Sequence, residues 1–151
     1  MSFEGECELL AGELRQKPMG TRKHAKLQGR INSRLLAFYG EDRTFIAFSI
    51  RHGEDVLIPD ICVTQAEEQQ LYRDILDEPA LLCVEIVSPS QRPEELFSKC
   101  EQYHEWGVAY CWVVDPISQR AWTYHAGQAA AQEVFEALTG PITLALDGLF
   151  D

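Results

Sequence analysis

Two acidic residues, Asp60 and Glu85, interrupt runs of apolar residues whose composition is typical of buried strands. Glu85 lies in the run from Leu81 to Val87, and Asp60 lies in the run from Leu57 to Val63. A buried carboxylate loses its hydration, so it needs a proton, a cation or hydrogen-bond donors close by. Two neighbouring strands that each carry one inward acid can place both carboxylates beside the same divalent cation. This pattern makes Asp60 and Glu85 candidate metal ligands.

Lys99 is the residue that can add a positive charge to such a site. A helix is predicted from Pro93 to about Trp106, because proline suits the first helical position, acidic residues follow it, and Gly107 comes after the last turn. On the helical wheel Lys99 lies within the apolar stripe that faces the sheet. Glu95, one turn earlier, is an alternative partner for Lys99. The helix is therefore expected to bring a cation towards the strand that carries Glu85.

The remaining elements are expected to follow one another without an internal repeat or a linker. Two short strands around a turn at Ala11 and Gly12 predict an amino-terminal hairpin. Apolar residues at helical spacing predict a helix from Thr21 to Phe38 that ends at Gly40. Further strands are expected at residues 44–50, 56–63, 81–87, 109–114, 120–125 and 133–138, with a hairpin turn at 52–55 and a loop over 65–79.

The segment from Leu81 to Val114 decides the fold class. A strand, a helix and a second strand in this order imply a parallel pair of strands joined by a right-handed crossover. The run from Leu81 to Val87 is apolar on both faces, which is typical of a central strand that is covered on both sides. The class is therefore α/β with a mixed sheet. The 151 residues are expected to form one domain, long enough to bury about two thirds of the unfolded surface.

The positive charge of the chain is concentrated in one segment. The net charge is −11, yet residues 15–34 hold seven of the thirteen Lys and Arg residues and no Asp or Glu. Within this segment Arg22, Lys23, Lys26 and Arg30 are candidate phosphate contacts, whereas His24 projects from the apolar side of the same helix. A solvated basic helix face that balances nearby acids explains the same pattern equally well.

Composition and patterning exclude several classes of protein. Hydrophobic residues make up 46% of the chain and aromatic residues 10%, which argues against disorder. No apolar stretch approaches the length of a membrane span and the amino terminus lacks the features of a secretory signal, so we expect a cytoplasmic protein without a membrane partner. The five cysteines are widely spaced among apolar residues, which is typical of buried side chains in a reducing compartment and not of a zinc site or a disulfide framework.

The order of the motifs along the chain carries a family resemblance. The motifs are Ile58-Pro59-Asp60, the run Val84 to Ser90, Glu95-Leu96 with Lys99 and Tyr103, Trp106-Gly107-Val108, and the run Tyr110 to Pro116. The run Leu9 to Leu14 followed by His24, and more weakly the run Leu144 to Phe150, agree with the same pattern. Together they resemble the Uma-two family, a large set of restriction-endonuclease-like proteins in the PD-(D/E)XK nuclease superfamily, over nearly the whole chain.

The resemblance implies a fold and a site. The superfamily core is a four-stranded mixed sheet flanked by helices, to which this chain adds the amino-terminal hairpin and further carboxy-terminal strands. Asp60 matches the acid of the Pro-Asp element and Glu85 matches the acid of the (D/E)XK element, so both are expected to hold Mg²⁺ or Mn²⁺. Val87 stands where the superfamily has its lysine, and the resemblance offers Lys99 as a migrated catalytic lysine.

Glu13 and His24 are the remaining site residues that the resemblance implies, either as part of the metal shell or as phosphate contacts. Several of these candidate site residues can instead have a purely structural role. His24 can be a core histidine and Asp60 a turn residue after proline, while Glu85 can pair with Arg43, Arg51 or Lys99.

Two functions from different classes fit these residues. The first is a magnesium-dependent DNA endonuclease, in which Lys99 orients or deprotonates the attacking water or neutralises charge in the transition state. The second is a catalytically inactive nuclease fold that serves as a binding or assembly module, such as a homodimer formed through the carboxy-terminal strands. The acidic net charge and Val87 favour the second function. Hydrolysis of a phosphodiester other than a nucleic acid is a third, weaker alternative.

Overall fold

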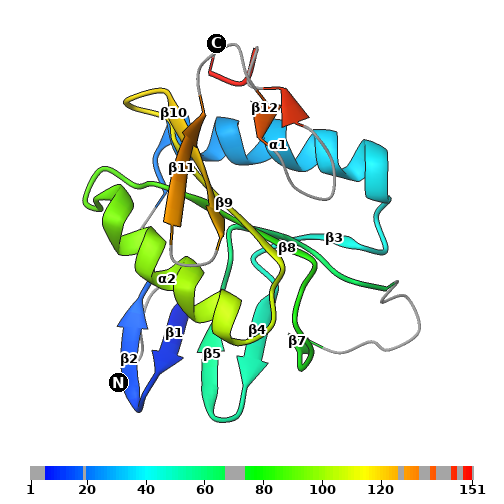
Figure 1. The fold of residues 1–151 in the computed structure, drawn as a ribbon, viewed down its shortest axis with the longest axis vertical. Helices are drawn as coiled ribbons and strands as arrows, with labels where there is room; N and C mark the ends of the chain where they lie inside the picture. The colour runs from blue at the N-terminus through cyan, green and yellow to red at the C-terminus, as the bar shows by residue number, and fades with distance from the viewer. Residues whose placement is uncertain are drawn as a thin grey trace.

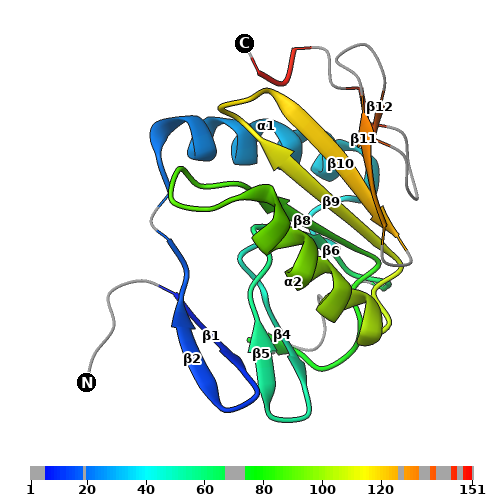
Figure 2. The same ribbon diagram turned by 60° about the vertical axis from the view of Figure 1, so that its left-hand side comes forward.

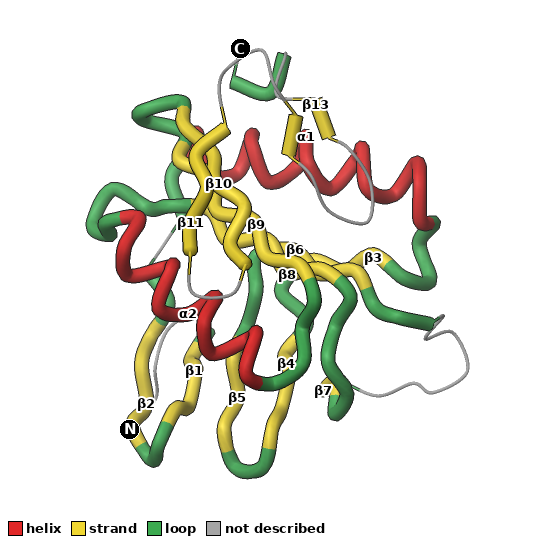
Figure 3. Tube along the Cα trace, in the orientation of Figure 1, coloured by secondary structure: helices red, strands yellow, loops and turns green. Residues whose placement is uncertain are grey.

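The computed structural model describes residues 6–18, 20–66, 74–125, 128–132, 137–138, 144–145 and 148–150, and the two helices and the strands fall within these ranges (Figures 1 and 3). The helices are α1 (Arg22–Tyr39) and α2 (Pro93–Glu105). The strands are β1 (Cys7–Leu10), β2 (Glu13–Gln16), β3 (Thr44–Ile46), β4 (Ser49–His52), β5 (Asp55–Leu57), β6 (Ile61–Val63), β7 (Ile75–Leu76), β8 (Leu82–Ile86), β9 (Tyr110–Asp115), β10 (Arg120–His125), β11 (Gln128–Gln132), β12 (Ala137–Leu138) and β13 (Leu144–Ala145).

A six-stranded mixed sheet forms the centre of the molecule, with the strand order β11-β10-β9-β8-β6-β3. The predicted central strand is β8, which pairs in parallel with β9 and antiparallel with β6. Helix α2 connects β8 to β9, as expected for a strand, helix and strand unit. The predicted α/β class with a mixed sheet is therefore confirmed.

The two helices cover opposite faces of this sheet (Figures 1 and 2). Successive side chains of a strand point to opposite faces. Accordingly, Cys83 and Val87 pack in a core that contains Tyr103 of α2, whereas Val84 packs in a core that contains Ile31 of α1. Glu85 therefore points to the α2 face, which is the direction expected from the sequence.

Two segments predicted as single strands are in fact divided between two sheets. The run 44–50 forms β3 in the central sheet and β4 in a second sheet of order β2-β1-β5-β4-β7, and the run 56–63 forms β5 and β6 in the same divided way. Ala47 adopts a positive φ of 55° where the chain passes from β3 to β4. Pro59, which has no N–H to donate within a sheet, lies where the chain passes from β5 to β6. The polypeptide thus changes sheet twice.

The second sheet contains the two predicted hairpins, which lie side by side in Figure 2. Strands β1 and β2 flank the turn at Ala11 and Gly12, and β1 pairs with β5 through Leu9 and Val56. Strands β4 and β5 form the second hairpin around Gly53 and Glu54. The predicted loop over 65–79 includes the short strand β7, which pairs in parallel with β4.

Helix α1 begins and ends where its sequence predicts. The Thr21 hydroxyl accepts a hydrogen bond from the backbone N–H of His24, which caps the first turn. Gly40 follows the last turn with a φ of 87°, a conformation that glycine adopts without the strain of a side chain. Leu27, Ile31 and Leu35 are buried against the sheet. The described helices include none that is long and apolar enough to cross a membrane.

The carboxy-terminal strands agree only partly with expectation. Strand β10 occupies 120–125 as predicted, but it pairs with β11, a strand that was not predicted. Of the strand expected at 133–138, residues 133–136 lie outside the described residues, and Ala137–Leu138 pair with β13 in a separate two-stranded sheet. All five cysteines are free, and the four other than Cys7 are buried, as expected.

Candidate active site

Asp60 directly precedes strand β6, and Glu85 lies on the adjacent strand β8. Strand β6 is antiparallel to β8, with Ile61 opposite Val84. Continuing this register one residue beyond the start of β6 sets Asp60 opposite Glu85. Residues in directly opposite positions share one face of a sheet, and like charges in such positions repel each other. The structure thus brings together the two acids that the sequence singled out and requires something to offset their repulsion.

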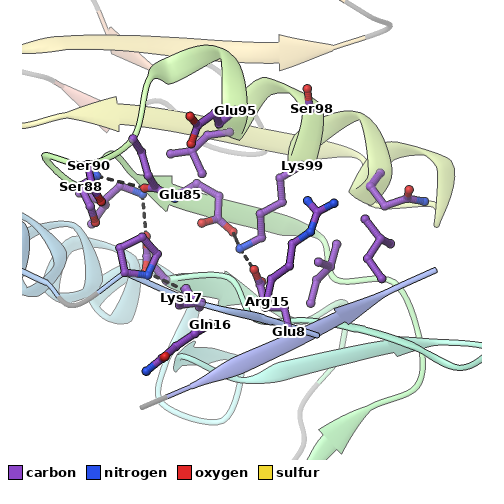
Figure 4. Close-up of a pocket in the computed structure, with 18 of the residues that line it drawn as sticks. Glu8, Arg15, Gln16, Lys17, Glu85, Ser88, Ser90, Glu95, Ser98 and Lys99 are labelled. Carbon is purple, nitrogen blue, oxygen red and sulfur yellow. Dashed lines mark hydrogen bonds and ion pairs between the residues drawn. The ribbon is translucent and has the colours of Figure 1, made fainter. Parts of the chain in front are cut away.

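The two acids line a cavity of about 340 Å³, called here the carboxylate cavity. Its walls come from the β1–β2 hairpin, the first turn of α1, the end of β5, the residues that follow β8, and the first three turns of α2 (Figure 4). Ser88, Ser90 and Gln91 line it directly after β8, and Glu95 lines it from α2. The cavity therefore opens where the carboxyl end of β8 meets the second sheet, an edge at which ligands commonly bind in α/β proteins.

Asp60 is buried and is held by three donors. Its Oδ1 lies 3.0 Å from Nζ of Lys17, and its Oδ2 accepts a 2.7 Å hydrogen bond from the backbone N–H of Ile86. Nε2 of His24 lies 3.4 Å from the same Oδ2. Burial alone would raise the pKa of Asp60, but His24, Lys17 and the Ile86 amide outweigh burial and hold the pKa below its usual range. Asp60 is therefore an ionised carboxylate at neutral pH.

Glu85 is more deeply buried than Asp60, with a relative exposure of 1%. Its Oε1 lies 2.8 Å from Nζ of Lys99 and accepts a 2.9 Å hydrogen bond from the Tyr103 hydroxyl. Burial raises the pKa of Glu85, while Lys99 and Lys17 lower it, and the net change is upward. Burial together with Glu85 raises the pKa of Tyr103 as well, so its hydroxyl keeps the proton that it donates.

Lys99 lies between two carboxylates, not beside the predicted alternative partner Glu95. Its Nζ is 2.8 Å from Oε1 of Glu85 and 2.6 Å from Oε2 of Glu8. Figure 4 draws the Lys99 side chain between these two acids. Burial would lower the pKa of Lys99, but Glu85 and Glu8 outweigh burial and raise it. Lys99 is thus a cation at neutral pH, and it reaches the site from α2 as the sequence predicted.

Glu8 and Lys17 are site residues that sequence reasoning missed. Glu8 on β1 accepts a 2.6 Å hydrogen bond from the Ile58 backbone N–H, and Ile58 O accepts hydrogen bonds of 2.7 Å from Lys17 and 3.1 Å from Lys99. These side chains satisfy the backbone where the chain crosses from β5 to β6. The available signal was alternation along the hairpin, because Glu8 and Leu10 share one face of β1 and both line the cavity.

The two remaining candidates, His24 and Glu13, occupy very different positions. His24 is buried in the first turn of α1 and faces Asp60, so it belongs to the site. Glu13 lies beside the hairpin turn, its side chain is 67% exposed, and its recorded partner is Arg15 at 3.6 Å. Glu13 does not line the carboxylate cavity, and the acid that the hairpin contributes there is Glu8. The expectation of a shell role for Glu13 is therefore not supported by its position.

The predicted phosphate contacts lie outside the carboxylate cavity. Arg22, Lys23, Lys26 and Arg30 line a second cavity of about 280 Å³, together with residues from the β9–β10 turn and from 148–150. These residues lie on the same helix as His24 but on another face of it. They do not contact Asp60 or Glu85.

The donor set fits a hydrated magnesium or manganese ion. Mg²⁺ is commonly held by one or two carboxylates and keeps several waters that exchange with substrate phosphate. Asp60 and Glu85 provide two hard oxygen donors at one cavity, each balanced by a lysine in the metal-free fold. The described residues contain no group of three or more His, Cys, Asp or Glu side chains arranged to hold a metal.

Comparison with known proteins identifies a family and a related fold. The model of the Uma2 family, described as "Putative restriction endonuclease", matches residues 3–149. A crystal structure described as a putative nuclease belonging to DUF820, from Anabaena variabilis ATCC 29413, has a TM-score of 0.86, covers 99% of this chain and 92% of its own, and is 23% identical. No curated protein matches. The family resemblance and the fold class inferred from the sequence are both confirmed.

Proposed function

This chain belongs to the Uma2 family, described as putative restriction endonucleases, and we propose that it is a metal-dependent endonuclease that hydrolyses DNA phosphodiester bonds. The observation that carries the proposal is the arrangement of Asp60 and Glu85 in opposite positions on neighbouring strands, with Nζ of Lys99 2.8 Å from Glu85. Two acids and a lysine at one cavity provide the charges that phosphodiester hydrolysis needs. Asp60 and Glu85 would hold Mg²⁺ or Mn²⁺, and a bound ion would lower the pKa of a water for attack and offset charge on the phosphoryl oxygens.

The neighbours of the two carboxylates keep them oriented for this task. The Ile86 N–H and His24 fix the direction of the Asp60 carboxylate, and the Tyr103 hydroxyl fixes that of Glu85. Ligating carboxylates that are themselves hydrogen-bonded hold their geometry better, and loss of such support commonly lowers metal affinity or activity about 10- to 100-fold. Tyr103 and His24 are therefore positioning residues in this proposal.

Lys99 acts as a cation and not as a base. Its raised pKa, caused by Glu85 and Glu8, keeps the ammonium protonated. A protonated lysine at the cavity wall donates hydrogen bonds and stabilises negative charge that develops on a phosphoryl oxygen. Of the roles that the sequence left open, this proposal assigns charge stabilisation and water orientation to Lys99.

The test is a cleavage assay on supercoiled plasmid and on short duplex and single-stranded oligonucleotides. Cleavage is expected with Mg²⁺ or Mn²⁺ and not with EDTA. Asp60→Asn, Glu85→Gln and Lys99→Met should each lower the rate by about 100- to 1,000-fold. Glu54→Gln is the matched control, because Glu54 is an exposed acid in the β4–β5 turn and does not line the cavity. Cleavage that persists in all three site variants would come from a contaminant or from another site, and the proposal would then be wrong.

One observation favours the alternative of a catalytically inactive module. Each acid is paired with a lysine, Asp60 with Lys17 and Glu85 with Lys99. A fold that had lost its metal could keep the two acids in this way. Calorimetric titration with Mn²⁺ separates the two functions, because the endonuclease must bind the ion and lose binding in Glu85→Gln, whereas the inactive module need not bind it.

A further inference from the structure

The second cavity, here called the basic groove, lies beside the carboxylate cavity at the same edge of the central sheet. Strands β8 and β9 are parallel neighbours, so their carboxyl ends meet at one edge. The carboxylate cavity is lined by Ser88 just after β8, and the basic groove is lined by Pro116 just after β9. Helix α1 contributes His24 to the first cavity and Lys23 to the second. A polymer bound at the carboxylates can therefore continue into the groove.

The cations of the groove are available for a ligand. Arg22, Lys23 and Lys26 are exposed and make no ion pair or side-chain hydrogen bond with the described part of the chain. In contrast, Arg51 pairs with Asp77 at 2.7 Å, and Lys99 pairs with two acids. The chain has a net charge of −11, yet within its described residues three cations in the first two turns of one helix have no acidic partner. Such a local concentration of unpaired positive charge favours binding of an anion.

Part of the groove lining is apolar. Leu27, Leu149 and Phe150 contribute to this part, and Leu149 is held against α1 by a 3.0 Å hydrogen bond from Nη1 of Arg30 to its carbonyl oxygen. Phe150 is partly buried, packed against the core that lies beneath α1. The groove therefore offers cations that suit a phosphate and apolar side chains that suit the face of a base. The face of a base is accessible to such side chains only in an unpaired strand, so the apolar lining favours a single-stranded segment over a duplex.

We propose that the basic groove is a second binding site that holds one nucleotide of a single-stranded nucleic-acid segment leading out of the carboxylate cavity. The phosphate lies against Arg22, Lys23 and Lys26, and the base lies against Phe150. The proposal rests on the proposed endonuclease function, because it assumes that the strand is bound at the carboxylate cavity and continues from there into the groove. It adds that the substrate is unpaired in this segment.

Binding is measured by fluorescence anisotropy with a labelled single-stranded oligonucleotide and with its duplex, in EDTA so that no cleavage occurs, over a series of salt concentrations. Each phosphate contact to a single strand contributes about 0.7 to the slope of log K against log salt. The double variant Lys23→Gln/Lys26→Gln should therefore reduce the slope by about 1.4. Arg51→Gln is the matched control, since Arg51 is an exposed cation on the second sheet and lies outside the groove; it should leave the slope unchanged.

The contribution of the base is tested without relying on a core variant. An oligonucleotide with abasic positions should bind the wild-type protein about 5- to 150-fold more weakly than the intact strand, because loss of one stacked base costs that much affinity. Phe150→Leu should remove most of this difference between the two probes while leaving the salt slope unchanged. Equal binding of abasic and intact strands would overturn the nucleotide site, and tighter binding of the duplex than of the single strand would overturn the assignment to an unpaired segment.

Failure of this proposal is distinguishable from failure of the proposed function. If Lys23→Gln/Lys26→Gln binds with the wild-type slope while Asp60→Asn abolishes cleavage, the groove proposal is wrong and the endonuclease stands. If the groove variants alter binding as expected but no substrate is cleaved in any metal, the groove stands and the endonuclease is wrong.

Discussion

Replacing Lys99 with methionine should destabilise the folded protein substantially. Nζ of Lys99 lies 2.6 Å from Glu8, 2.8 Å from Glu85 and 3.1 Å from the carbonyl oxygen of Ile58. Methionine keeps most of the apolar stem that packs in α2 but removes all three contacts. The substitution therefore leaves two acids facing each other at the edge of the core, without the cation that separates them.

The size of the effect follows from burial. Removing one partner of a buried ion pair costs about 3–5 kcal/mol. The side chains of Lys99 and Glu85 are only 11% and 2% exposed, so water replaces little of the lost interaction. Glu85 can take up a proton instead, because burial already raises its pKa, and this limits the cost to the lower end, about 3 kcal/mol. In the double variant Lys99→Met/Glu85→Gln both charges are gone, and the interaction energy between the two positions should be about 1–3 kcal/mol.

The assay is urea denaturation near neutral pH in EDTA, followed by tryptophan fluorescence, for the wild type, both single variants and the double variant. Arg51→Met is the control, because it breaks an exposed ion pair with Asp77 and should cost no more than about 1 kcal/mol. Lowering the pH should reduce the penalty in Lys99→Met, since a carboxyl whose folded-state pKa is raised takes up protons more readily when folded. A cost for Lys99→Met as small as the control, or single-variant costs that simply add in the double variant, would refute this account of the site.

Three further outcomes are expected. Glu8→Gln should lower both metal-dependent cleavage and the midpoint of urea denaturation, whereas Glu13→Gln, on the same hairpin but 67% exposed, should change neither. The stability difference between the wild type and Asp60→Asn should be largest at neutral pH and should shrink as the pH falls below about 3.9, the unfolded value, because a lowered folded-state pKa contributes stability that is lost on acidification; urea midpoints over a pH series measure it. Gly107→Ala should raise the unfolding rate and cost more than about 1 kcal/mol, because Gly107 has a φ of 98° and an added Cβ would meet Pro79 at 3.0 Å.

The local elements could be predicted because the formation of each helix or strand depends mainly on residues that are close in sequence. Alternation along the strand from Leu82 to Ile86 directed Glu85 towards α2, and the helical wheel directed Lys99 towards the sheet, so the facing of these two residues followed from two independent periodicities. The caps of α1 at Thr21 and Gly40 were likewise visible in the sequence.

The parts that sequence reasoning missed depend on contacts between distant segments. Glu8 enters the site only because β1 docks on β5, and this pairing rests on the match between Leu9 and Val56. The divided strands were not predicted for a related reason. The apolar run continues across Ile58 and Pro59, where the chain passes from one sheet to the other. The backbone groups of Ile58 are hydrogen-bonded there by Glu8 and two lysines, which are distant in sequence. Apolar periodicity reports burial but does not report which sheet a residue joins.

The pairing of two acids with two lysines has a consequence for binding. Asp60 and Glu85 in opposite positions would repel each other, and Lys17 and Lys99 offset this repulsion in the metal-free fold. A divalent cation that binds to these carboxylates therefore competes with ammonium groups that the fold already supplies, which weakens metal binding to the free protein. A substrate phosphate offers the displaced lysines a new acceptor, so metal and nucleic acid should each bind more tightly in the presence of the other, by the same factor. The two lysines therefore favour the complex that contains both metal and nucleic acid over the complex that contains metal alone. They contribute to substrate binding as directly as the two carboxylates contribute to metal binding.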